Sequence, residues 1–86
     1  MTNEEFRNAI IEALRTDPPL ESYDILVSYK DGGGEQAKAY EILMGILIEY
    51  QESGVEEAVV DELCDIMDCV AGETANRVWP RHLGNP

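Results

Sequence analysis

The sequence predicts an all-α fold, a small bundle of three to four helices. Apolar residues recur at helical spacing in several segments, capping signals precede two of these segments, and glycine or proline residues follow them. With 86 residues, the chain is long enough for one domain and too short for two. We therefore expect a single helical domain over residues 1–80 and a flexible tail over residues 81–86.

The first predicted helix spans about residues 3–15. Thr2 and Glu5 have the spacing of a capping box, in which each side chain accepts a hydrogen bond from the other residue's backbone N–H. The apolar residues that follow recur at helical spacing. We expect the helix to end before Pro18, because a residue that precedes proline avoids the α conformation.

The second predicted helix spans about residues 18–31. Pro18 suits a first helical position, Lys30 lies in the last turn, and three glycines at 32–34 follow where a helix end favours positive φ. The β-branched and aromatic content of residues 25–29 is instead typical of a strand. A single strand would have no partner, so we predict a helix and keep the strand as the alternative.

The third and fourth predicted helices span about residues 35–52 and 54–71. Apolar residues cover most of the circumference of the third helix, so we expect it to be the central one. Gly45, in its middle, costs roughly 1 kcal/mol relative to alanine, which suggests that another backbone approaches closely there. Ser53 and Glu56 repeat the capping-box spacing just before the fourth helix.

The charge of the chain indicates which partners it can have. It contains 18 Asp and Glu residues against 6 Lys and Arg, for a net charge of -12. Direct nucleic-acid binding requires a basic surface, so we do not expect this chain to bind nucleic acid. The electric field of a strongly negative protein instead attracts basic proteins. No apolar run is long enough to cross a membrane, and the first residues do not resemble a signal peptide. We therefore expect a cytoplasmic protein that does not bind membranes.

The sequence contains no motif of a catalytic or metal site. Cys64, Cys69 and His82 do not form a zinc-ligand pattern, and we expect both cysteines to be reduced and partly buried. His82 is the only histidine and falls in the predicted tail, so no serine has a base for nucleophilic catalysis. The glycines at 32–34 lack the motif of a phosphate loop. We therefore expect no enzymatic activity, no metal ion and no cofactor.

Carboxylates are concentrated in the C-terminal half of the chain. From Ala39 to Asn76 there is no Lys or Arg. In the fourth predicted helix, carboxylates separated by four, four and three positions share one face, with Glu62 beside them. They are Glu57, Asp61, Asp65 and Asp68. Like charges at this spacing destabilise a helix by about 0.2–0.5 kcal/mol per pair. A role in binding would explain why the sequence keeps a row of carboxylates that destabilises the helix carrying it.

We expect this face to bind a basic protein partner. Tyr and Trp contribute much of the binding energy at protein contacts, so Tyr40, Tyr50 or Trp79 could supply anchors. The candidate binding residues are Glu57, Asp61, Glu62, Asp65, Asp68, Tyr50 and Trp79. The simplest alternative is that the face is only solvated, as charged helix faces usually are. A divalent cation is a further alternative, although the chain has no oxygen-ligand loop of the D-x-D-x-D-G type.

In size, helicity and negative surface, the chain resembles the small acidic immunity proteins that bacteria make against their own nuclease toxins. The resemblance includes no alignable motif and lacks the tyrosine-centred signature of the colicin DNase immunity group, so it transfers no binding residue. It implies a non-enzymatic inhibitor of a nuclease or of another nucleic-acid-binding protein. The alternative function is structural: the apolar excess of the third helix would form a subunit interface, which would make the protein a homodimer instead of a monomer.

Overall fold

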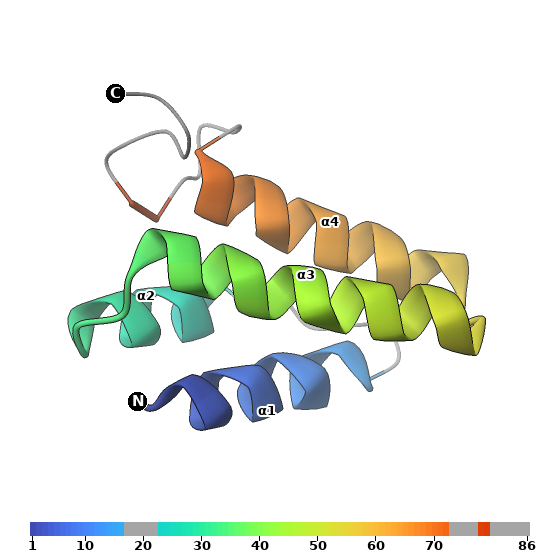
Figure 1. Ribbon diagram of the computed structural model, residues 1–86, viewed down its shortest axis with the longest axis horizontal. Helices are drawn as coiled ribbons and strands as arrows, with labels where there is room; N and C mark the ends of the chain where they lie inside the picture. The colour runs from blue at the N-terminus through green and yellow to red at the C-terminus, as the bar shows by residue number, and fades with distance from the viewer. Residues whose placement is uncertain (17–22, 73–77, 80–86) are drawn as a thin grey trace.

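A computed structural model of the chain describes residues 1–16, 23–72 and 78–79, which form four helices (Figure 1). The all-α prediction is confirmed, and within the described ranges residues 23–31 form a helix and not a strand. The start of the second predicted helix, residues 18–22, and the predicted tail, residues 81–86, lie outside the described residues. The helices are α1 (Asn3–Leu14), α2 (Tyr23–Asp31), α3 (Gln36–Ser53) and α4 (Glu57–Ala71).

Consecutive helices run in opposite directions, with α3 between α1 and α4 in the view of Figure 1. The contact between α3 and α4 is the most extensive one, and α1 packs against each of the other three helices. The radius of gyration is 12.1 Å, close to the roughly 12 Å expected of a compact domain of this length. None of the described helices is long and apolar enough to cross a membrane.

The core centres on three aromatic rings from different parts of the chain. Phe6 of α1 stacks on Tyr29 of α2 with ring centroids 4.3 Å apart, and Trp79 meets Tyr29 edge-on at 6.5 Å. Trp79 is thus folded onto the bundle. Aliphatic side chains from all four helices complete the core: Ile10, Leu14, Leu26, Ala39, Leu43, Ile46, Leu63, Ile66, Met67 and Val70.

The capping box of the first helix forms as predicted. The backbone N–H of Glu5 donates to the Thr2 hydroxyl at 3.1 Å, and that of Thr2 donates to the Glu5 carboxylate at 2.7 Å. The glycines after α2 also end that helix as predicted. Gly33 has a φ of 94°, and the N–H of Gly34 donates to the carbonyl of Tyr29 at 2.9 Å. These local signals therefore fix where two of the helices begin or end.

Two predictions made around α3 are wrong. Ser53 does not cap α4, because it is the last residue of α3 and its hydroxyl donates to the carbonyl of Glu49 at 2.8 Å. The chain then turns at Gly54, which has a φ of 70°, and α4 begins only at Glu57. Gly45 is not a point of close backbone approach: it is exposed, and a Cβ atom there would meet nothing within 4 Å.

Candidate functional site

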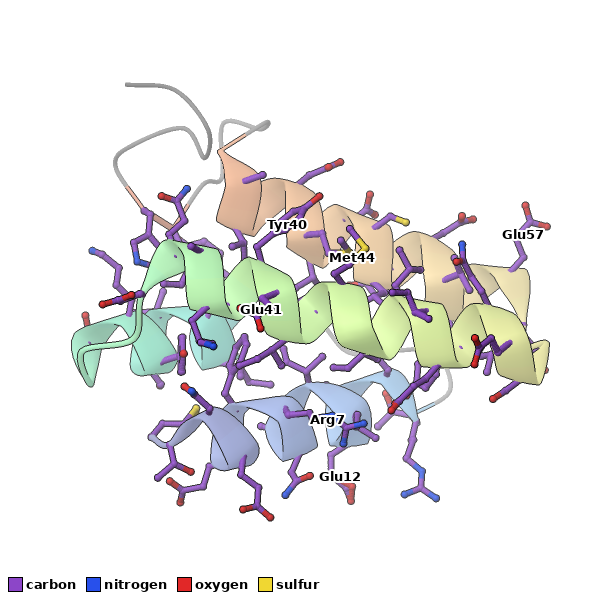
Figure 2. The ribbon with its side chains drawn as sticks, in the orientation of Figure 1. Arg7, Glu12, Tyr40, Glu41, Met44 and Glu57 are labelled. Atoms are coloured by element: carbon purple, nitrogen blue, oxygen red, sulfur yellow. The ribbon has the colours of Figure 1, made fainter. Side chains whose placement is uncertain are left out.

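Helix α4 separates apolar from charged side chains around its circumference. Leu63, Ile66 and Val70 are buried on the side that packs against the other helices. Four exposed carboxylates lie on the opposite side, since residues three or four positions apart share a face of a helix. Figure 2 shows one of them, Glu57, projecting away from the bundle. We call this set the acidic face: Glu57, Asp61, Asp65 and Asp68.

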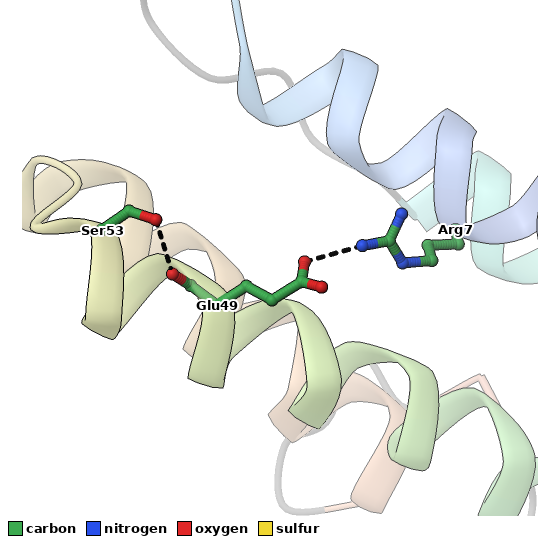
Figure 3. Close-up of polar contacts among 3 residues, drawn as sticks. All are labelled: Arg7, Glu49 and Ser53. Atoms are coloured by element: carbon green, nitrogen blue, oxygen red, sulfur yellow. Dashed lines mark hydrogen bonds and ion pairs between the residues drawn. The ribbon is translucent and has the colours of Figure 1, made fainter.

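The acidic face has no counterion within residues 1–16, 23–72 and 78–79. The ion pairs in these ranges join Arg7 to Glu49, with Nη2 2.6 Å from Oε2, and Lys38 to Glu41, with Nζ 3.3 Å from Oε2. The first of them links α1 to α3 (Figure 3). Neither pair involves α4, so they leave the acidic face free to attract an external cation.

The acidic face extends into a part of α4 where carboxylates are unfavourable. Glu57 lies in the first turn, where the helix dipole stabilises an anion. Asp65 and Asp68 lie in the C-terminal half, where the dipole disfavours anions, and the last turn contains no basic residue. Helix α4 therefore forms despite Asp65 and Asp68, which do not stabilise it.

The other predicted binding residues lie away from this face. Glu62 is half-buried on α4. Tyr50 is half-buried on α3 and packs against the core. Trp79 is only 8% exposed and contacts Tyr29, so it has little surface to offer a partner. The structure thus brings the four carboxylates together but does not place an aromatic anchor among them.

An apolar strip on α3 was not predicted as a binding surface, although one of its residues, Tyr40, was named as a possible anchor. Ile48 is 50% exposed, Ala37 is exposed, and Tyr40 and Met44 are half-buried. Spacings of three, four and four positions place these residues in one row along the helix. In Figure 2, Tyr40 and Met44 lie at the edge of α3 that faces α4. We call Ala37, Tyr40, Met44 and Ile48 the α3 strip. The signal for it was present in the sequence, because α3 has more apolar residues than its neighbours can cover.

A hollow of about 270 Å³ lies beside the glycine turn. It is smaller than most ligand pockets, which start at about 300 Å³. Glu35 and Lys38 both line it, and the Lys38 ammonium already pairs with Glu41. These opposed charges favour neither an anion nor a cation. Among the described residues, no group of three or more His, Cys, Asp or Glu side chains could hold a metal ion.

No protein-family model matches the chain, and searches of curated proteins and of solved structures return no match. The function is therefore inferred from the chemistry of the surface. Two features of that surface need an explanation that the fold does not supply. They are the acidic face of α4 and the α3 strip.

Proposed function

We propose that this protein is a non-enzymatic binding protein whose acidic face docks on a basic surface of another protein. The observation that carries the proposal is the row of four exposed carboxylates without a described counterion. A nuclease or another nucleic-acid-binding protein is a suitable partner, because a surface that binds phosphates must be basic. By covering that surface, the protein would act as an immunity or inhibitor protein.

The geometry of α4 supports recognition by a partner. With a rise of 1.5 Å per residue, the row from Glu57 to Asp68 is about 16 Å long. The opposite side of the helix is anchored in the core by Leu63 and Val70, which are fully buried. Carboxylates held on a rigid scaffold lose little conformational freedom when a partner binds. The net charge of -12 also speeds the encounter with a basic protein over distances of about a Debye length.

A pair of charge-reversal variants tests the proposal. Asp61→Lys with Asp65→Lys reverses the centre of the acidic face. The control, Glu12→Lys with Asp31→Lys, changes the net charge equally at exposed positions near the ends of α1 and α2. Lysine is favourable near a helix C-terminus, so the control should fold. Partners are captured from an extract of the source cells, and the association rate of each purified partner is measured by stopped-flow fluorescence.

The proposal predicts that the Asp61 and Asp65 reversals slow association about tenfold at low salt and reduce its salt dependence. The control variant should change the association rate much less, because its charges lie on other helices. If both double variants slow association equally, only the net charge matters and the acidic face is not the binding site. Binding that ignores both added salt and the Asp61 and Asp65 reversals would also rule out the proposal.

A further inference from the structure

The α3 strip is an apolar surface that the bundle covers only in part: Ala37 and Ile48 are exposed, and Tyr40 and Met44 are half-buried against the core. Ile48 is the most exposed large apolar side chain of the described residues, at 50%. Its row continues through Met44 and Tyr40 to Ala37, over about three helical turns. Exposed single apolar side chains are common, but a continuous apolar row bordered by charges is typical of a protein contact.

Nothing in the described part of the structure requires a glycine at position 45, beside this strip. It lies in the interior of α3, its φ is not positive, and it is exposed. A Cβ atom at Gly45 would meet nothing within 4 Å, so alanine would fit there. Glycine costs about 1 kcal/mol relative to alanine in a helix interior. On the helical surface Gly45 neighbours Ile48, three positions later, so its lack of a side chain lets an external backbone approach the strip.

The charges around the α3 strip indicate what kind of partner fits. Glu41 precedes Gly45 by four positions and Glu52 follows Ile48 by four, so exposed carboxylates border the outer side of the strip, Glu41 being paired with Lys38 at 3.3 Å. On the other side lies α4, and Figure 2 shows Glu57 of its acidic face projecting away from the bundle. A second copy of this chain would bring the same negative border and a further net charge of -12. Charge complementarity therefore favours a basic occupant over self-association.

We infer that the α3 strip and Gly45 bind an amphipathic α-helix of the partner, one with an apolar ridge flanked by Lys or Arg. This inference rests on the proposed function and deepens it, because it names the part of the basic partner that is held. The apolar ridge would lie along Met44 and Ile48, with its backbone close to Gly45. The flanking cations would meet Glu52 on one side, together with Glu41 in competition with Lys38, and the acidic face on the other. Helices bind in this way when anchors at positions i, i+4 and i+7 fill an apolar groove.

Defined peptides test this inference without a known partner. The probe is a fluorescein-labelled synthetic peptide of three to four turns, with leucines along one face and lysines elsewhere. The control peptide has serine in place of leucine and the same charge. Dissociation constants are measured by fluorescence anisotropy for the natural protein and for Ile48→Gln and Gly45→Gln. Tyr23→Gln is the matched control, because Tyr23 is 45% exposed but lies on α2.

The expected result is that Ile48→Gln and Gly45→Gln each weaken binding of the leucine peptide about fivefold. Tyr23→Gln should leave it unchanged, and none of the three substitutions should affect the serine peptide. Circular dichroism establishes that every variant is folded. Equal binding of the leucine peptide to Ile48→Gln and to the natural protein would overturn the inference.

Two further outcomes separate this inference from the proposed function. If the Asp61 and Asp65 reversals weaken both peptides while Ile48→Gln has no effect, the acidic face stands and the α3 strip is excluded. If only Ile48→Gln and Gly45→Gln weaken the leucine peptide, the strip stands and the acidic face is excluded. Sedimentation tests the self-association alternative. A micromolar dimer of the natural protein that Ile48→Gln dissociates would overturn the inference in favour of a homodimer.

Discussion

Replacing Gly45 by alanine should stabilise the protein. The new Cβ atom would meet nothing within 4 Å, and the backbone there is helical. Alanine lowers the conformational entropy of the unfolded chain and is the best helix former, so the expected gain is about 1 kcal/mol. For a domain of this size, that gain raises the melting temperature by about 4–8 °C.

The same substitution at Gly34 should have the opposite effect. Its Cβ atom would lie 2.6 Å from the carbonyl oxygen of Tyr29 and would also overlap the tyrosine ring. That ring cannot easily move, because it stacks on Phe6 and its hydroxyl donates to Asn3 at 2.6 Å. Overpacking of this kind costs about 1–3 kcal/mol. We therefore expect Gly34→Ala to lower the melting temperature.

Thermal unfolding followed by circular dichroism compares the two variants with the natural protein. Urea unfolding gives the free-energy differences independently, provided that the slope of the transition is unchanged. The reasoning about Gly45 is refuted if Gly45→Ala lowers the melting temperature, since α3 would then have a neighbour at that position. A neutral effect of Gly34→Ala would show that the turn after α2 is not built around Tyr29 as described.

Two further predictions concern hydrogen bonds at the ends of the first two helices. Thr2→Ala removes the hydroxyl that accepts from the Glu5 N–H in the capping box of α1 and should lower the unfolding free energy by about 1 kcal/mol in urea titrations. Hydrogen bonds from the Thr2 backbone N–H, which the substitution keeps, and from the Thr2 side chain, which it removes, lower the pKa of Glu5, so both contacts stabilise at neutral pH. The part of the difference between variant and natural protein that comes from the side-chain contact should shrink as the pH falls through that lowered pKa. Tyr29→Phe removes the bond to Asn3 and should cost about 1 kcal/mol at pH 7. Burial raises the pKa of Tyr29, so the natural protein should lose stability above about pH 10, where the unfolded chain ionises first, and the variant should lose less.

The parts of the fold that the sequence predicted depend on short-range signals. The capping box at Thr2 and the glycines after α2 act within a few residues, so they can be recognised without knowing how the helices pack. Ser53 shows the limit of this approach. Its spacing to Glu56 matched a capping box, but α3 continues through Ser53 and its hydroxyl bonds within that helix instead. Where one helix ends and the next begins depends on the turn at Gly54, which competes with the capping signal.

The candidate site could be predicted only in part, for a similar reason. Helical spacing alone places Asp61 and Asp65 on one exposed face, and the structure shows them there. Helical spacing could not show that Trp79 would pack against Tyr29 in the core, because that contact joins distant segments of the chain. Nor could it show which apolar residues of α3 remain exposed, such as Ile48, since this depends on where α1 and α4 lie around that helix.

The central claim is that a basic partner binds to α4 and the neighbouring edge of α3. An NMR titration of the isotopically labelled protein with the leucine and lysine peptide tests it most directly. We predict that the largest chemical-shift changes occur at the amides of residues 57–68 and 37–48. The changes should be much smaller along α1, since Glu12 lies at the opposite edge of the molecule from Glu57 (Figure 2). Shift changes centred on α1 and α2, or spread evenly over the surface, would contradict the claim.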